Sequence, residues 1–484
     1  MANPIRKLQF FADAAWRLGP RAGTLGLWGK GPGAWLADRR LGAKPMDFFA
    51  GRDIRPLWEA QRWAGLPADP QEFCAAWMAA NPPFQGPHWR CGQEAAIRTL
   101  HLALTLPAPL PAWVRPVLQA HARRIAANPA YAMAQDNNHP LSEAAGLLAC
   151  GLLLDQPGLT RRGAARLERH ARRLISPDGA FAQPSPAYHR LMLEVLVAAE
   201  TLRRRWSGPA ASPDLLARAR AATLWLSRMT CPLTGALPRI GHQDGSAFFA
   251  MAEDARPGLA MAGSLFGAVT AAPAWRSEGF RGWSTAGARA VLRTGPLRFR
   301  PAHADLLHFD LWDGPLNLLR DGGTGAYNPA PENAWWLEHF WSVRAHNTVQ
   351  FDADEPMPRL SRFLHAQWPA TGEDARGDWM RDARGRRHSR AVRSAGRAWQ
   401  VHDALEGRYA TATLRWRLAP MPWRLLPDGV QGDAARITIT ADGPLAVTLE
   451  QGWESLAYGQ VSPCPVLVAR GAVGRFETLI RLRP

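Results

Sequence analysis

The chain has 484 residues, of which 47% are hydrophobic and 20% charged, and its 22 Trp and 17 Phe supply ample material for a buried core. This composition excludes a largely disordered protein, and the length suits two or three domains. Lys and Arg outnumber Asp and Glu by 58 to 41, which favours a polyanionic partner: nucleic acid, anionic lipid or acidic polysaccharide. The arginines are scattered and no nucleic-acid-binding motif occurs, so nucleic acid is the least favoured of these. A GC-rich genome that favours Arg codons would produce the same charge.

The N-terminal segment lacks the continuous apolar stretch of a signal peptide, because Asp13 and Arg17 interrupt it. No run of about 18 apolar residues occurs, so we expect no integral membrane segment. The sequence therefore predicts a cytoplasmic protein, with the periplasm as the second choice. Residues 5–18 suit an amphipathic basic helix, which either lies on a membrane surface or, as we favour, packs on its own domain. Five cysteines without a CxxC pair predict buried free thiols.

Two regimes of hydrophobic spacing follow along the chain. Residues 1–85 are rich in Pro, Gly and Trp and are predicted to be an irregular helical lead-in that packs on the next domain. Residues 86–285 show helical apolar spacing in successive segments with short connections, which indicates stacked helical hairpins. A solenoid and a closed α/α toroid both fit this pattern, and the lack of a strict repeat period favours the toroid.

Residues 286–484 change to a period of two, in short apolar runs that turn residues separate. Such a series predicts a large antiparallel β-sandwich. The expected fold class is therefore a multidomain α+β protein, with an N-terminal (α/α) toroid followed by a C-terminal antiparallel β-sandwich.

Polar groups gather where loops meet helices or strands. In the helical half they occur in three segments, residues 136–143 (DNNHPLSE), 183–189 (QPSPAYH) and 241–245 (GHQDG). In the strand half they occur in residues 301–305 (PAHAD), 320–325 (RDGGTG) and 345–349 (AHNTV). Taken in order, these segments resemble the heparinase II/III-like polysaccharide lyases, which share a toroid, a sandwich and an HAD, D-G-G and AHNTV series. The resemblance covers roughly residues 85–360 with motifs.

This resemblance implies cleavage of a uronate-containing acidic polysaccharide or oligosaccharide by β-elimination. The reaction needs a group that neutralises the substrate carboxylate, a base for the C5 proton and an acid for the leaving oxygen. The resemblance assigns Asn138 and His139 to neutralisation and proton abstraction, and Tyr188 to acid or acid/base duty. Glu143, His189 and His242 are expected to bind substrate or to orient His139.

The same resemblance implies a zinc ion with a mainly structural role. Its expected ligands are His303, Asp321 and His346, because two imidazoles and a carboxylate form a normal zinc set with one position left for water. The alternative is a hydrogen-bonded cluster without metal, since Asp and His often only orient each other.

Several observations keep other interpretations open. Asn138 and His139 also suit a helix cap before Pro140, and Tyr188 suits a half-buried packing position. Pro301 stands where many family members have a cleft histidine, which leaves room for a glycan-binding protein of exopolysaccharide or capsule metabolism that has lost catalysis. A glycoside hydrolase on a similar toroid would need two carboxylates, for which Glu143 and Asp244 are the candidates.

Overall fold

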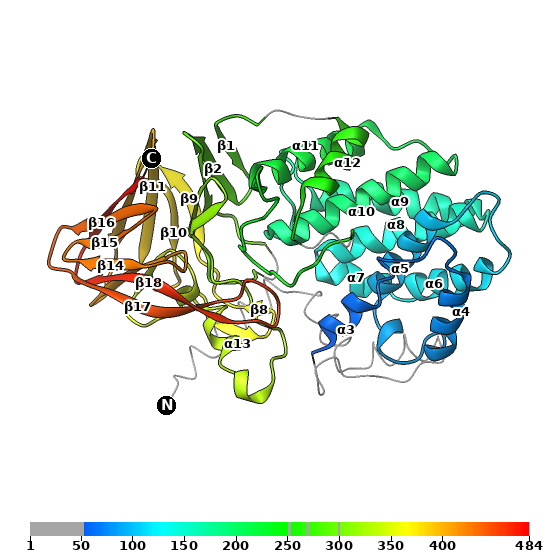
Figure 1. Ribbon diagram of the computed structural model, residues 1–484, viewed down its shortest axis with the longest axis horizontal. Coiled ribbons are helices and arrows are strands. Elements are labelled where there is room, and N and C mark those ends of the chain that lie inside the picture. Colours follow the sequence, from blue (N-terminus) through cyan, green and yellow to red (C-terminus); the bar gives the residue numbers. More distant parts are fainter. Residues whose placement is uncertain (1–52, 250–252, 268–270, 299–300, 484) are drawn as a thin grey trace.

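Helices precede strands along the chain in the computed structural model, which describes residues 53–249, 253–267, 271–298 and 301–483 (Figure 1). The helices of the first half are α3 (Ile54–Ala60), α4 (Gln71–Ala80), α5 (Gly92–Thr105), α6 (Val114–Ala127), α7 (Pro129–Gln135), α8 (Asn138–Leu153), α9 (Pro157–Leu174), α10 (Pro186–Arg205), α11 (Pro213–Met229) and α12 (Arg256–Phe266). The expected helix 5–18 lies outside the described residues. Within the described ranges, no helix combines the length and the apolar character needed to cross a membrane.

Helices α5, α8 and α10 form the inner layer of the helical half, since they are buried along almost their whole length. Helix α9 packs against α8 but keeps an exposed basic face. This alternation of buried and half-exposed helices is the hairpin arrangement that the apolar spacing predicts.

The three inner helices start at the same end of the helical half. The side-chain amide of Asn138, the first residue of α8, donates to the side-chain oxygen of Gln93 at the start of α5. Further along, His101 of α5 and Glu194 of α10 both bind the backbone of Phe248, at 2.8 Å and 2.7 Å. Helices α5, α8 and α10 therefore run in one direction, and residues at their N-terminal ends are neighbours in space.

Side-chain caps fix where two of these helices begin. The Asn137 side chain accepts a hydrogen bond from the backbone N–H of His139 at 3.1 Å and starts α8. Ser185 accepts from the backbone N–H of Tyr188 at 3.3 Å and starts α10, with Pro186 at the first helical position. The cap of α8 is therefore Asn137 and not the expected Asn138, which is the first residue of the helix. The two caps hold His139 and Tyr188 at helix starts.

The strands of the described residues form four antiparallel sheets. The five-stranded sheet has the order β1 (Ala274–Ser277), β2 (Phe280–Thr285), β3 (Ala288–Arg293), β4 (Phe309–Asp313), β5 (Leu316–Leu319). The eight-stranded sheet has the order β14 (Trp423–Leu426), β15 (Gly429–Gly432), β16 (Ala435–Ala441), β19 (Arg475–Leu482), β12 (Ala398–Glu406), β11 (Arg387–Ala395), β10 (Gly377–Arg381), β9 (Ala370–Asp374). The four-stranded sheet has the order β17 (Ala446–Glu454), β18 (Ser462–Gly471), β13 (Ala412–Arg417), β6 (Val349–Phe351), and β7 (Arg359–Ser361) pairs with β8 (Leu364–His365).

One apolar core joins the three large sheets, with contributions from β3, β4, β6, β12, β13, β16, β18 and β19. Strand β13 shows how the period of two produces it. Leu414 and Trp416 point into the core, where the Trp416 indole donates to Thr478 Oγ1 of β19 at 3.2 Å. The alternate residues of β13 face the other side of the sheet. The predicted order of a helical region followed by antiparallel sheets is confirmed.

Two details complete the fold. The strands begin at Ala274, before the expected boundary at residue 286, because β1 and β2 pair with β3 in the five-stranded sheet. All five cysteines are buried and free, as the sequence predicts.

Candidate active site

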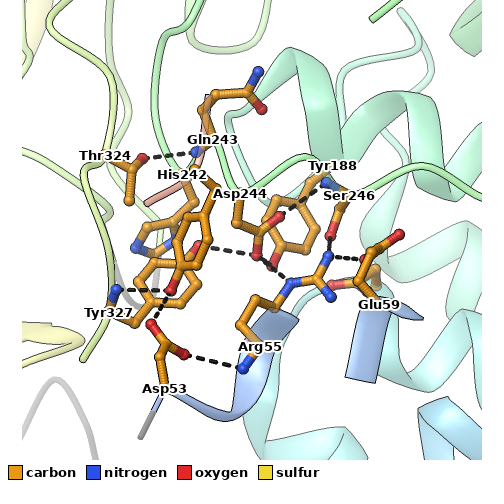
Figure 2. Close-up of polar contacts among 12 residues, drawn as sticks. Asp53, Arg55, Glu59, Tyr188, His242, Gln243, Asp244, Ser246, Thr324 and Tyr327 are labelled. Atoms are coloured by element: carbon orange, nitrogen blue, oxygen red, sulfur yellow. Dashed lines mark hydrogen bonds and ion pairs between the residues drawn. The ribbon is translucent and has the colours of Figure 1, made fainter. Parts of the chain in front are cut away.

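Asp244 is the centre of a buried polar cluster that brings together the helical half and the β half (Figure 2). The Tyr188 hydroxyl donates to Asp244 Oδ2 at 2.5 Å. Arg55 Nε donates to the same oxygen at 2.9 Å, and the Tyr327 hydroxyl does so at 3.2 Å. The backbone N–H of Ser246 donates to Oδ1 at 3.0 Å. Both carboxylate oxygens of Asp244 are therefore occupied.

Helix α3 supplies the cation of this cluster. Besides Asp244, the Arg55 guanidinium contacts Ser246 Oγ at 2.6 Å, and it forms an ion pair with Glu59. The residue before the helix, Asp53, accepts from the Tyr458 hydroxyl at 2.5 Å and from the backbone N–H of Asn328 at 3.1 Å. Helix α3 thus connects the helical half to the β half. Sequence reasoning missed Arg55 because it lies in the Pro-, Gly- and Trp-rich segment that has no clear pattern.

The charges of the cluster determine whether Tyr188 can act as an acid or as a base. Burial opposes ionisation of Asp244, but the Arg55 guanidinium outweighs it and holds the pKa of Asp244 well below its usual range. Burial and the Asp244 carboxylate raise the pKa of Tyr188 well above that of a free phenol. Tyr188 is therefore a protonated hydroxyl at neutral pH. This geometry suits a proton donor and does not suit a tyrosinate base.

His139 is half-buried at the start of α8. Its Nδ1 lies 3.6 Å from Cys91 Sγ, and its ring packs edge-on against Tyr131 with 5.9 Å between the ring centroids. Burial raises the pKa of Cys91 to about 12, so the sulfur stays a thiol at neutral pH. In the tautomer in which Nδ1–H donates to this sulfur, Nε2 is the basic nitrogen of His139.

Asn138 is fully buried beside His139, and its amide nitrogen is held by Gln93. Its Oδ1 is buried and has no hydrogen-bond partner among the described residues. To touch a substrate carboxylate, the amide of Asn138 would have to leave Gln93. A buried cation that sequence reasoning missed, Arg90, directly precedes Cys91, the residue whose sulfur lies against His139.

Two of the expected substrate-binding residues, His189 and His242, have buried side chains. His189 is fully buried, stacks on Trp225 with centroids 4.2 Å apart and contacts the Gly179 carbonyl at 3.0 Å, so it packs in the core. His242 is also buried, with its ring edge-on to Tyr327 and to other aromatic rings. The resemblance implied contact with substrate for both residues, and that role stays a prediction.

Glu143 lies inside the helical half rather than on a substrate surface. It is buried against Gly92, where a Cβ would approach its Oε1 to 2.4 Å. Burial raises the pKa of Glu143 to about 8. This carboxyl group is therefore mostly protonated at neutral pH, and its expected role in binding substrate or orienting His139 stays a prediction.

Loops from both halves meet beside the Asp244 cluster. The backbone N–H of Gln243 donates to Thr324 Oγ1 of the D-G-G-T-G segment at 2.8 Å, and Ser185 Oγ bonds to the His242 carbonyl at 2.5 Å. Gly241 has φ +70°, and a Cβ there would lie 2.4 Å from the Pro184 carbonyl oxygen, so this contact requires glycine. The polar segments of the sequence thus converge in space.

His303, Asp321 and His346 form a compact group in the β half, with candidate ligand atoms within 4.8 Å of one another. His346 Nδ1 lies 2.7 Å from Asp321 Oδ2. Both ring nitrogens of His303 and Nε2 of His346 are buried without a hydrogen-bond partner among the described residues. Burial lowers the pKa of His303, which keeps it in the neutral form that binds metals. The donor set fits a zinc ion, and the partnerless nitrogens are unexpected for a self-sufficient hydrogen-bond cluster.

Pro301 is buried next to this group, and its backbone accepts a hydrogen bond from His365. His365 lies in β8. If both rings were protonated, the charges of His365 and His303 would repel each other. A histidine from a distant segment therefore lies near the position where Pro301 replaces the family's usual cleft histidine.

Comparisons with known proteins agree with these motifs. The sequence profile of the family described as heparinase II/III-like, C-terminal, matches residues 269–482. No curated protein sequence matches the chain. A solved heparinase III gene product is 17% identical with a TM-score of 0.64, and the match covers 89% of this chain and 77% of that one. Another heparinase III crystal structure is 15% identical with a TM-score of 0.66 over 85% and 72% of the two chains. The heparan sulfate lyase HepC from Pedobacter heparinus is 17% identical with a TM-score of 0.58 over 89% and 76%. At these identities the structural likeness establishes the fold.

Proposed function

We propose that this chain, whose residues 269–482 belong to the heparinase II/III-like C-terminal family, is a polysaccharide lyase that cleaves a uronate-containing polysaccharide or oligosaccharide by β-elimination. The observation that carries the proposal is the pairing of a phenol held in its protonated form with a histidine at the same end of the inner helices. These two groups supply the acid and the base that the reaction needs.

In the proposed reaction His139 Nε2 removes the C5 proton of the uronate. The electron pair of that C–H bond forms the C4–C5 double bond as the C4–oxygen bond breaks. Tyr188 donates its proton to the departing oxygen, and Asp244 and Arg55 hold the hydroxyl in place before the transfer. The proton taken by His139 then returns the tyrosinate to its neutral form through solvent, which balances the cycle.

The negative charge of the substrate requires a positive environment near His139. Arg90 brings a buried positive charge to this side of the helical half, because it directly precedes Cys91, whose sulfur lies against His139. Asn138 can contribute an amide donor to the carboxylate if its side chain exchanges Gln93 for the substrate. Both would stabilise the charge that develops on the carboxylate as C5 loses its proton.

We further propose that His303, Asp321 and His346 hold one zinc ion with a structural role. A bound zinc ion would cross-link three segments of the β half that the chain sequence separates. No step of the elimination passes through it. The cytoplasm is the proposed site of action, on imported oligosaccharides or beside exopolysaccharide synthesis.

The hydrolase alternative loses support from the Asp244 cluster. A glycosidase needs one carboxylic acid and one available carboxylate. Asp244 accepts from Arg55, Tyr188 and a backbone N–H, and its pKa is lowered, so it is neither a proton donor nor a free nucleophile. The glycan-binding alternative differs from the lyase only in lacking turnover.

A screen of acidic polysaccharides for ultraviolet absorbance tests the proposal, because elimination alone creates the conjugated double bond of an unsaturated uronate. We expect at least one uronate polymer to yield this product, and neutral glycans to yield none. Reducing ends that appear without the absorbance would indicate a hydrolase. Binding of acidic glycans with neither product would indicate a binding protein.

A further inference from the structure

The outer face of the four-stranded sheet carries a cavity of about 700 Å³ that lies on a different part of the β half from the Asp244 cluster. The floor of the cavity is formed by side chains that alternate with core residues along strand β13. Arg415 and Arg417 of β13 alternate with the core residues Leu414 and Trp416, so they face outward together. Arg470 of β18, opposite Thr413, completes the floor.

Positive charge dominates this cavity. Its lining includes four arginines, which are Arg344, Arg415, Arg417 and Arg470, against two acidic residues, Asp352 and Glu450. One of these acids is already committed, since Asp352 accepts from the backbone N–H groups of Ala410 and Thr411 at 2.8 Å and 3.0 Å. The lining histidine adds no charge, because burial lowers the pKa of His339 to about 4 and leaves it neutral.

Arg415 is the residue that most clearly points to a missing ligand. It is half-buried on the cavity floor, it forms no ion pair among the described residues, and its Nη1 is buried without a hydrogen-bond partner. Burial, together with the charges of Arg344 and Arg470, lowers its pKa to about 10. A guanidinium in this position gains hydrogen bonds and relief from repulsion when an anion binds.

The cavity continues along the surface into a second one of about 450 Å³, and the two share His339 and Arg344 in their linings. The second cavity adds Arg359, whose guanidinium lies over the Trp341 ring at 3.7 Å from its centroid. It also adds the carboxyl groups of Glu338 and Glu355, of which Glu355 accepts from the backbone N–H of Val343 at 3.0 Å. Trp335 of the second cavity packs against Trp453 of the first, with centroids 5.3 Å apart, and is 38% exposed. The result is an elongated groove with cations and aromatic rings along it.

A small aromatic core separates this groove from the Asp244 cluster. Tyr327, Trp336, Phe340 and Trp341 form it, with Trp453 packed against them. Tyr327 points its hydroxyl at Asp244, whereas Trp341 and Trp453 line the groove. Tyr188 is not among the residues that line either cavity.

We propose that this groove, lined by Arg344, Arg415, Arg417, Arg470, Trp335 and Trp453, is a second binding site that holds an acidic glycan segment through its carboxylate or sulfate groups. The choice of a glycan rests on the proposed function, whereas the anion site rests on the four arginines of the first cavity and on the partnerless Nη1 of Arg415. A glycan fits both features of the groove, because each sugar ring offers an apolar face for an indole and a charged substituent for a guanidinium. Such a site would keep a polymer attached while the reaction centre acts on another part of it.

Calorimetric titration with a sulfated uronate oligosaccharide, its desulfated counterpart and inorganic sulfate tests the proposal. A Tyr188→Phe background prevents turnover during the titration. We expect Arg415→Gln to weaken glycan and sulfate binding in the groove about tenfold, as loss of one charge-assisted contact does. Arg481→Gln, which changes an exposed arginine on the eight-stranded sheet, is the matched control and should leave binding unchanged. Arg415→Gln breaks no described hydrogen bond of the side chain, so its Tm should equal that of the parent.

The outcomes separate this proposal from the proposed function. Equal affinities of Arg415→Gln and Arg481→Gln for all three ligands would contradict the proposed binding site in the groove, whatever the lyase screen shows. Weakened binding of sulfate and glycan in Arg415→Gln would support it even if no polymer is cleaved. A single-stranded DNA of similar charge is a further probe. If Arg415→Gln weakens DNA binding and no glycan binds in the groove, the ligand of the groove is nucleic acid and not a glycan. Arg344→Gln, at the exposed edge, provides a second variant with the same expected direction.

Discussion

A single hydrogen bond defines the chemistry open to Tyr188. Its hydroxyl donates to a carboxylate that an arginine keeps ionised, and this raises the pKa of the phenol. The same carboxylate accepts from Tyr327 at the longer distance of 3.2 Å, so the chain contains a second phenol in a related position. The two tyrosines provide a matched pair for separating proton transfer from support of the cluster.

Tyr188→Phe should lower the elimination rate by about a hundredfold or more, because it removes the proposed general acid and little else. Tyr327→Phe removes a hydroxyl from the same carboxylate and should cost less than tenfold. Steady-state rates on the polymer identified by the screen measure both, with circular dichroism to verify the fold. Equal losses in the two variants would assign Tyr188 to support of Asp244 rather than to proton transfer.

Glu143 makes a second residue-scale prediction, about the pH dependence of stability. Its pKa is raised to about 8 by burial, while in the unfolded chain it has the ordinary value of a carboxyl group. Between these two values the folded state binds more protons than the unfolded state, so stability falls as pH rises through this window. Glu143→Gln removes the titration and should raise stability at pH 8 by on the order of a few kcal/mol, with little effect near pH 5.

Thermal unfolding at the two pH values measures this effect. Glu72→Gln, on the exposed side of α4, is the control and should not change the pH dependence. A Glu143→Gln protein with the same pH dependence as the parent would mean that Glu143 is ionised in the folded state.

The residue types of the site could be predicted from the sequence, but the direction of each side chain could not. Tyr188 and His139 stand at helix starts, where caps and Pro fix the backbone, and the sequence contains those caps. His189 follows Tyr188 directly, yet successive helical residues point about 100° apart, which turns His189 onto Trp225. A sequence motif does not reveal that difference unless the facing helix is known.

At the scale of elements, α3 is the part of the site that the sequence did not reveal. Its seven residues carry no amphipathic pattern long enough to recognise, and its role depends on partners almost 200 residues away. Arg55 nevertheless neutralises Asp244, and Asp53 at its start ties the helix to the β half. Helix α3 therefore links the helical half to the β half.

Arg55→Met should destabilise the fold by about 3 kcal/mol or more, because it leaves the Asp244 carboxylate buried without its cation. Arg55→Lys keeps the charge and should lose less. Adding Asp244→Asn to Arg55→Met should restore much of the lost stability, since no uncompensated charge remains, while activity stays low. Chemical denaturation measures these three variants. Equal losses in the Lys and Met variants would show that packing, and not charge, is what Arg55 contributes.

The proposed zinc site also acts at the scale of elements, because its ligands come from three separate segments of the β half. Purified protein should contain about one zinc per chain, and removal by a chelator should lower Tm. His346→Ala should lower Tm in the metal-loaded protein and abolish the effect of the chelator. A protein free of metal after purification, with a Tm that added zinc does not change, would support the alternative of a cluster held by hydrogen bonds.

At the scale of the whole molecule, the order of helices and sheets could be predicted because each half repeats one period many times. The boundary could not be placed as well. The strands β1 and β2 contain Gly282 and alternate polar and apolar residues weakly, so they look like a connection until β3 pairs with them. The division into three large sheets around one core depends on pairings between distant strands, such as β12 with β19, which local periodicity does not contain.

The net positive charge of the chain predicts how salt affects the binding of an acidic glycan. The chain carries a formal charge of +17, and charges on its surface act on a polyanion over distances that salt shortens to about 8 Å at physiological ionic strength. The association rate of an acidic oligosaccharide should therefore fall as salt rises, and an uncharged analogue should bind poorly at every salt concentration. Contacts at the buried centre are screened far less, since water and ions are excluded there. Stopped-flow association over a range of salt, combined with turnover measurements, separates the two contributions.

Arg161→Gln, on the exposed basic face of α9, should change the salt slope slightly and leave turnover intact. His139→Ala should do the reverse, because it removes the proposed base but no surface charge. If the uncharged glycan binds better than the acidic one, the elimination has no carboxylate to act on, and the lyase proposal fails.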